Sequence, residues 1–344
     1  MRKLLNTIYI TNENAYLSLE SNNLVCTVDK DVRLKVPLDN VENIVCFSYL
    51  GCSPGLMGEC VKKKIPVNFL TPGGKFLAKI YGETKGNVFL RIRQIDRFRE
   101  QGLTLAKNEV AAKLSNCIFT VRRTIHDHPE LKEDEKIVST VQVLKDGIQK
   151  AESCDSVESL LGIEGNCASE YFAIFPKLIT GSGLSETFQF RNKRPPLDPV
   201  NALLSFVYTL ETVDCSSALE TVGLDSYIGF YHALRSGRVS LACDLVEEFR
   251  GIGERFVLSI LNLKIIGKED FDRQLTGAVL LNSDGKKKLI SKWQEKKRSE
   301  IYHPVLKQNI PYGLLPYVQS NLLAKYIRGE TDEYIPLLLK RTVK

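Results

Sequence analysis

The chain of 344 residues is 43% hydrophobic and 26% charged, and its formal net charge is +6. This length favours two domains, and the hydrophobic content is enough for a sizeable core. No apolar run reaches the roughly 18 residues of a membrane span, so the composition excludes a transmembrane protein and predicts a soluble, cytoplasmic one. The nine cysteines are irregularly spaced without a Cys-x-x-Cys pair, which favours free thiols over a disulfide framework or a zinc site.

The amino-terminal part of the chain has the period-two alternation of β-strands. One helix is predicted among them, beginning at Pro54 and ending in lysines, as the helix dipole favours. We therefore predict a small, mostly β domain over residues 1–82. Its expected strands lie near residues 8–10, 15–20, 23–29, 42–50, 65–70 and 75–81.

From about residue 86 a helical period replaces the alternation. A long helix is predicted over 89–125, and the helical pattern then runs, with a break at the prolines of 195–199, to about residue 327. The predicted fold is α+β and multidomain. It consists of a small amino-terminal β-sheet domain (1–82), a linker (83–88) and an all-α domain (89–344) that carries the chemistry.

Glu164 lies in the apolar stripe of a predicted helix over residues 157–172. An unpaired, ionised carboxylate in such a stripe would cost about several kcal/mol. The side chain is therefore either neutral or paired with a positive charge, and that charge can be a metal ion or an arginine.

A second cluster combines His232 with the carboxylates of Asp244 and Glu247. We expect His232 to close an aromatic-rich helix, and Asp244 and Glu247 to share one face of the next helix. One imidazole and several carboxylate oxygens suit Mg²⁺ or Mn²⁺ better than zinc. The alternatives are a structural histidine in the core and carboxylates that face solvent, as we expect for Glu248.

Other motifs are missing from the sequence. No Gly-x-Gly-x-x-Gly follows a strand and no Walker loop is present, so a nucleotide cofactor is not expected. The basic residues gather locally, and the clusters at 191–194 and 235–238 flank the carboxylate and histidine motifs. That distribution indicates a nucleic-acid partner more strongly than the net charge does.

Four motifs in order resemble the CRISPR-associated integrase family, CRISPR-associated protein one. The motifs are Gly162-Ile-Glu164-Gly-Asn, Arg194-Pro-Pro-Leu-Asp-Pro-Val-Asn201-Ala-Leu-Leu-Ser205-Phe-Val-Tyr208, Gly229-Phe-Tyr-His232 and Asp244-Leu-Val-Glu247-Glu-Phe-Arg250. The resemblance spans nearly the whole chain. The segments Cys52-Ser-Pro-Gly-Leu-Met-Gly and Leu70-Thr-Pro-Gly-Gly look like the type I-C variant.

The resemblance implies a DNA endonuclease and integrase that inserts captured fragments into a CRISPR array by transesterification. It implies Glu164, His232 and Glu247 as ligands of Mg²⁺ or Mn²⁺, and Asp244 as a further catalytic position, either behind the ligands or as an alternative ligand. It also implies a homodimer, for which the open sheet edges of the β domain are a candidate surface, and a small dimeric partner, CRISPR-associated protein two.

Five residues are candidates for binding DNA. Four arginines are expected to grip phosphates, and Tyr208 to contact phosphate or base, although core packing explains Tyr208 equally well. The arginines are Arg191, Arg194, Arg235 and Arg238.

Two other functions would use the same residues. One is a stand-alone nuclease that hydrolyses branched or single-stranded DNA, and the other is a DNA-binding scaffold without catalysis.

Overall fold

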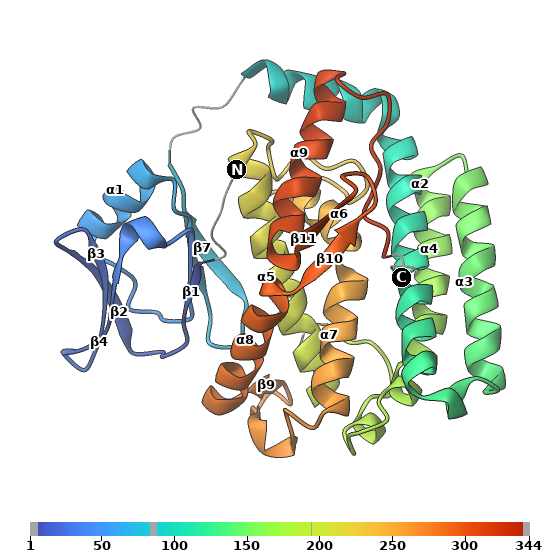
Figure 1. Cartoon of the computed structure of the whole chain (residues 1–344), viewed down its shortest axis with the longest axis horizontal. Helices are drawn as coiled ribbons and strands as arrows, with labels where there is room; N and C mark the ends of the chain where they lie inside the picture. Colours follow the sequence, from blue (N-terminus) through green and yellow to red (C-terminus); the bar gives the residue numbers. More distant parts are fainter. Residues whose placement is uncertain (1–5, 83–87, 194, 340–344) are drawn as a thin grey trace.

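The computed structural model describes residues 6–82, 88–193 and 195–339 (Figure 1). An amino-terminal β region, residues 6–82, lies beside a largely helical region, residues 88–339. The predicted linker falls mostly on residues 83–87, outside the described residues, and the first long helix begins at Val88. In the described part of the chain, no helix is both long enough and apolar enough to cross a membrane.

The β region contains two sheets. Strands β2 (Ala15–Glu20), β3 (Asn23–Val28) and β4 (Asp31–Pro37) form an antiparallel sheet. The other sheet has the order β1-β5-β6-β7, with β1 (Thr7–Ile10), β5 (Asn43–Cys46), β6 (Val67–Leu70) and β7 (Phe76–Ile80). The strand β4 was not predicted. Its side chains are mostly exposed, so it lacks the apolar run that identifies a strand in sequence.

The predicted short helix is confirmed as α1 (Pro54–Lys63). The hydroxyl of Ser53 caps its start by accepting a hydrogen bond from the Leu56 amide, and Lys64 ends it in a left-handed conformation. Because α1 lies between β5 and β6, it is the crossover that lets these two strands pair in parallel.

The helical region begins with α2 (Val88–Asp127), which packs with α3 (Glu135–Ser153) and α4 (Val157–Ile174) as a bundle (Figure 1). The helix α5 (Pro199–Thr221) is buried along most of its length. Around it lie α6 (Ser240–Glu247), α7 (Arg250–Asn262) and α9 (Leu315–Arg328). The remaining long helix is α8 (Ser283–Arg298).

The prediction of an all-α second region is too simple, because two short hairpins interrupt the helices. They are β8 (Phe271–Arg273) with β9 (Val279–Leu281), and β10 (Glu300–His303) with β11 (Gln308–Pro311). Gly277 and Lys307, in the connections, have the positive φ angles that tight turns require. Strands of three or four residues are too short for a period-two signal to identify them.

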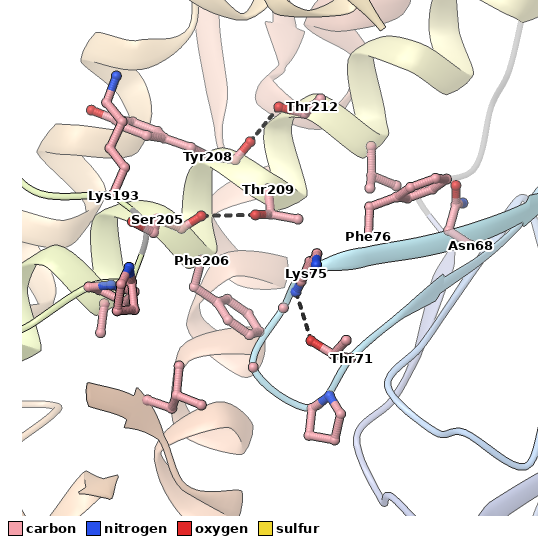
Figure 2. A pocket seen from close by; sticks show the side chains of 18 of the residues that line it. Asn68, Thr71, Lys75, Phe76, Lys193, Ser205, Phe206, Tyr208, Thr209 and Thr212 are labelled. Atoms are coloured by element: carbon pink, nitrogen blue, oxygen red, sulfur yellow. Dashed lines mark hydrogen bonds between the residues drawn. The ribbon is translucent and has the colours of Figure 1, made fainter. Parts of the chain in front are cut away.

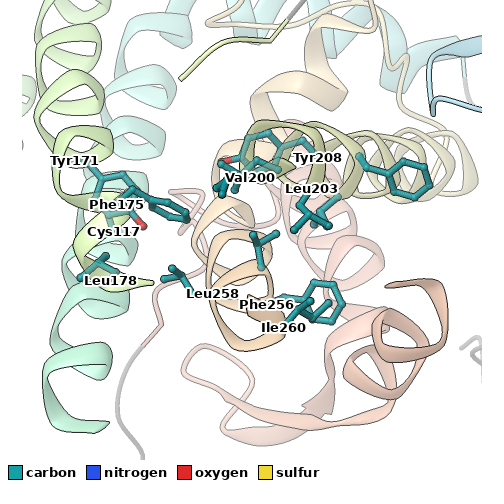
Figure 3. Packing of buried hydrophobic residues seen from close by; sticks show 14 of the residues in the cluster. Cys117, Tyr171, Phe175, Leu178, Val200, Leu203, Tyr208, Phe256, Leu258 and Ile260 are labelled. Carbon is teal, nitrogen blue, oxygen red and sulfur yellow. The ribbon is translucent and has the colours of Figure 1, made fainter. Parts of the chain in front are cut away.

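The largest hydrophobic core lies between α2, α4, α5 and α7 (Figure 3). Tyr171 and Phe175 pack edge to face within it. Phe47 of the β region stacks on Phe206 of α5, with ring centroids 5.5 Å apart, so the two regions share part of this core. All nine cysteines are free, as predicted.

Candidate active site

Three predicted residues from three parts of the fold meet around one lysine. Glu164 lies on α4, Glu247 is the last residue of α6, and His232 lies in the loop between α5 and α6. The ammonium group of Lys113, on α2, contacts Glu164 Oε1 and lies 2.7 Å from Glu247 Oε2. The His232 Nε2 atom lies 3.9 Å from Glu247 Oε1. The structure thus brings together the carboxylates and the imidazole that the sequence singled out.

Asp244 lies behind the histidine and does not face the two glutamates. Its carboxylate accepts hydrogen bonds from the backbone amides of Phe230, Tyr231 and His232 and lies 2.7 Å from His232 Nδ1. Since a carboxylate only accepts, the imidazole proton is assigned to Nδ1, which leaves Nε2 as the atom directed at Glu247. In this geometry Asp244 contacts the imidazole and the loop that carries it, and not the two glutamates.

The prediction that His232 closes a helix is wrong. Residues 222–239 form a loop without a helix, and hydrogen bonds to Asp244 hold its backbone in place. A side chain at Gly229 would be only 2.5 Å from Asp244 Oδ2 and 2.9 Å from Ser240 Cβ. The spacing of the aromatic residues resembles a helix face. The backbone of this segment instead lies against the Asp244 carboxylate, and that contact holds it as a loop.

Positive charge surrounds Glu247. Burial alone would raise the pKa of its carboxyl group, but Arg250 and Lys113 hold that pKa well below the usual range. The Arg250 Nε atom donates to Glu247 Oε2 over 2.7 Å, and the guanidinium lies over the ring of Tyr208, 4.4 Å from its centroid. Glu247 is therefore an ionised carboxylate in a buried site.

Glu248 is fully buried, so the expectation that it faces solvent is wrong. Its carboxylate accepts hydrogen bonds from the Tyr334 hydroxyl, the Gln319 amide and the Leu337 backbone. Burial and then repulsion by Glu248 raise the pKa of the Glu109 carboxyl group well above its usual value. This network joins the carboxy-terminal segment to the residue that follows Glu247.

The three candidate ligands, two carboxylates and an imidazole, fit a hard divalent cation by their chemistry. Within the described ranges, no group of three or more His, Cys, Asp or Glu side chains is arranged closely enough to hold a metal ion as it stands. The Lys113 ammonium group lies between Glu164 and Glu247 and pairs with one oxygen of each.

A cleft of about 1500 Å³ lies between the β region and α5, and His232 and Arg250 form part of its wall. Figure 2 shows Lys193 and Ser205 on one side of it and Thr71 and Lys75, from the loop between β6 and β7, on the other. Its lining is rich in basic side chains. These are Lys75, Lys79, Arg191, Lys193, Arg235, Arg238, Arg250 and Lys286.

The predicted DNA-binding residues occupy different environments. Arg235 and Arg238 line the cleft in the loop after His232, and Arg235 is exposed. Arg191 also lines it, but its guanidinium donates to Asn201 Oδ1 and Ser205 Oγ. Tyr208 is buried, and its hydroxyl donates to Glu254 Oε1 over 2.6 Å. Arg194 lies outside the described residues.

Tyr208 therefore supports the arginines rather than presenting its hydroxyl to the cleft. The guanidinium of Arg191 lies 5.4 Å from the centre of the Tyr208 ring, as part of the same stack that holds Arg250.

Sequence reasoning missed Lys113 as a functional candidate, whereas Lys193 was covered as part of the basic cluster at 191–194. Lys113 is one basic residue in a 40-residue helix, and nothing in its local sequence distinguishes it.

The β region, the helical region and the cluster of two glutamates and a histidine beside a basic cleft define a nucleic-acid-processing class of protein. Residues 8–295 match the family described as CRISPR associated protein Cas1. The chain is 43% identical over 342 residues to the CRISPR-associated endonuclease Cas1 1 of Chlorobaculum tepidum. The aligned residues make up 98% of this chain and 99% of that relative. The chain belongs to the Cas1 family.

Two solved structures share the fold. A casposase bound to its integration product superposes with a TM-score of 0.83 at 20% identity, covering 95% of this chain and 92% of that one. A chain of a Cas6-RT-Cas1–Cas2 complex superposes with a TM-score of 0.81 at 20% identity, covering 100% of this chain and 37% of that one. At these identities the likeness shows a common fold.

Proposed function

We propose that this protein is a DNA endonuclease and integrase, dependent on Mg²⁺ or Mn²⁺, that inserts captured foreign DNA into a CRISPR array. The observation that carries the proposal is the convergence of Glu164, His232 and Glu247 beside a basic cleft. Membership of the Cas1 family, whose curated relatives are named endonucleases, supports it.

The chemistry is a transesterification in which a DNA 3′-hydroxyl attacks a phosphodiester, forms a new phosphodiester bond and displaces another 3′-hydroxyl. A divalent ion held by Glu164, His232 and Glu247 would lower the pKa of that hydroxyl and stabilise charge on the reacting phosphate. The protein supplies the positions: Asp244 fixes the imidazole ring, and Arg250 keeps Glu247 ionised and oriented. Since Arg235 and Arg238 line the cleft that leads to His232, they would hold the DNA backbone in register.

The domain roles follow from the same arrangement. We assign dimerisation to residues 1–82, a linking role to 83–88 and catalysis to 89–344. The edge strands β4 and β7 carry exposed apolar side chains outside the cleft, among them Val32 and Leu77, which suit pairing with a second copy. A monomer in light scattering would contradict this assignment. The solved Cas1–Cas2 complex of the same fold supports Cas2 as a partner.

We also assign the chain to the type I-C variant, on the segments at 52–58 and 70–74. Partner choice tests the assignment: integration that requires the Cas2 of a type I-C operon, and fails with one from another subtype, is the expected result.

The decisive experiment is a strand-transfer assay. A short duplex with free 3′-hydroxyls is incubated with a supercoiled plasmid carrying the repeat, with and without Mn²⁺, using wild type, Glu164→Ala and His232→Ala. Joined products that require Mn²⁺ and disappear in both variants are expected. Cleavage without joining would favour the hydrolytic nuclease. DNA binding that is unaffected by a chelator, without any reaction, would favour the scaffold.

A further inference from the structure

Lys113 is the one residue at the site's centre that the proposed mechanism does not use. Its side chain is 11% exposed, and its ammonium group lies between Glu164 of α4 and Glu247 of α6. Lysine is rarely buried unless it is paired, and here both partners are the candidate metal ligands. One oxygen of each candidate glutamate ligand is therefore paired with a charge that belongs to the protein.

The two cations that contact Glu247 differ in how they are held. Arg250 reaches Glu247 from three residues away on the same stretch of chain and is stacked on Tyr208, so its guanidinium is fixed. Lys113 reaches the site from α2 on a flexible four-carbon stem and is the cation that contacts both glutamates. Of these two charges, Lys113 is the one that can move away.

The charges explain what such movement would do. With Lys113 in place, Glu164 and Glu247 face positive charge from Lys113 and Arg250, so the carboxylates are already compensated. A divalent ion and an ammonium group cannot share one position, because like charges a few ångströms apart repel strongly in a buried site. Binding a metal ion therefore requires breaking the Lys113 contacts, and the apparent affinity is reduced accordingly.

We propose that Lys113 is an exchangeable cation that pairs with Glu164 and Glu247 until a divalent ion displaces it, and that it thereby sets the metal concentration the enzyme requires. This inference rests on the proposed metal site at these two residues. It assigns Lys113 as a residue that determines metal affinity, through competition and not through coordination.

The test is direct measurement of Mn²⁺ binding to the full-length protein at pH 8, by calorimetry or by the electron paramagnetic resonance signal of free Mn²⁺. Wild type is compared with Lys113→Met, which keeps the length of the side chain but not its charge, and with Lys113→Arg, which keeps the charge. The matched control is Lys136→Met, because Lys136 pairs with Glu170 across α3 and α4 at an exposed position, with 2.5 Å between Nζ and Oε2. Glu164→Ala shows whether binding occurs at this site.

Lys113→Met is expected to bind Mn²⁺ about tenfold or more tightly, the range of a lost charge-assisted hydrogen bond. Lys113→Arg and Lys136→Met should bind no more tightly than wild type. Unchanged or weaker binding by Lys113→Met, with wild type still binding, overturns this inference alone. If neither wild type nor Lys113→Met binds Mn²⁺, the proposed metal site fails with it.

Folding of the variant is a second readout. In Lys113→Met, Arg250 still pairs with Glu247 but Glu164 loses its contact with the ammonium group, so the thermal midpoint should fall in chelator and recover when Mn²⁺ is added. This rise on adding Mn²⁺ should exceed that of wild type. A variant that is destabilised equally with and without Mn²⁺ would show a structural role only and would overturn the proposal.

Discussion

The Oδ1 atom of Asp244 lies 2.7 Å from Nδ1 of His232 and also accepts the His232 backbone amide, so one carboxylate fixes both the ring and the loop that carries it. Carboxylates that orient a ligating histidine in this way tune both its direction and its basicity. Asp244 is completely buried, and its partners are the described backbone amides of residues 230–232 together with that imidazole.

Replacing Asp244 by asparagine should weaken Mn²⁺ binding by about 10- to 100-fold, because an amide has no charge and one acceptor oxygen instead of two, so it cannot accept from the three backbone amides and the His232 ring together. Calorimetric titration with Mn²⁺ measures the effect. The control is Asp225→Asn in the same loop, where the carboxylate accepts the Tyr227 amide at a distance from the site. Equal Mn²⁺ affinity in wild type and Asp244→Asn would show that the histidine does not depend on this contact.

The buried network at the carboxy terminus should contribute to stability. Tyr334→Phe removes a hydroxyl that donates to Glu248 and accepts from Gln319 Nε2 over 3.1 Å. Loss of a donor to a buried carboxylate is expected to lower the free energy of unfolding by about 1–3 kcal/mol. Urea denaturation measures it, with Tyr302→Phe as the control because Tyr302 is 41% exposed. Equal losses in the two variants would exclude a special role for the Glu248 contact.

DNA binding should depend on pH through Lys193. Desolvation, followed by repulsion from Arg250 and Arg191, lowers the pKa of its ammonium group to about 8. A bound phosphate would raise that pKa again, so binding takes up a proton when the pH is above 8. Below pH 8 the free protein is already charged and no dependence on Lys193 is expected. Above it, affinity should fall by up to about tenfold per pH unit.

Fluorescence anisotropy with labelled DNA, in chelator between pH 7 and 9.5, measures this dependence. Lys193→Arg keeps its charge throughout the range and should remove the slope. A slope that persists unchanged in Lys193→Arg would assign the titration to another group.

The contact between the two regions should be sensitive to Gly74. Its φ angle is +87°, and a Cβ atom there would lie 2.9 Å from the ring of Phe206 on α5. Gly51 has a similar φ of +77° with no atom within 4 Å, so Gly51→Ala isolates the backbone cost of about 1–2 kcal/mol.

Gly74→Ala should lose about 1–3 kcal/mol more of the free energy of unfolding than Gly51→Ala, because it adds overpacking against Phe206. Urea denaturation of the two variants gives the difference. Equal losses would mean that the loop between β6 and β7 can move away from α5 without cost.

The sequence by itself predicted the division of the chain and the candidate ligands. Alternating and helical periods separate residues 1–82 from the helices because local hydrophobic patterns mirror which face is buried. Glu164 was recognisable because a carboxylate interrupts an apolar stripe. Such a carboxylate, when ionised, needs a positively charged partner, but the stripe does not show which one. The edge strand β4 and the two short hairpins were missed, since a few half-exposed residues carry almost no periodic signal.

Only the tertiary structure decided which partner each charge has. Lys113 and Glu164 are 51 residues apart, and Glu248 and Leu337 are 89 apart, so no local pattern links them. The same holds for His232, whose loop is shaped by a carboxylate 12 residues later. Charge pairing acts through space, and its strength depends on burial that many distant segments create together. For this reason the sequence named the candidate ligands, but only the fold showed the lysine between the two glutamates.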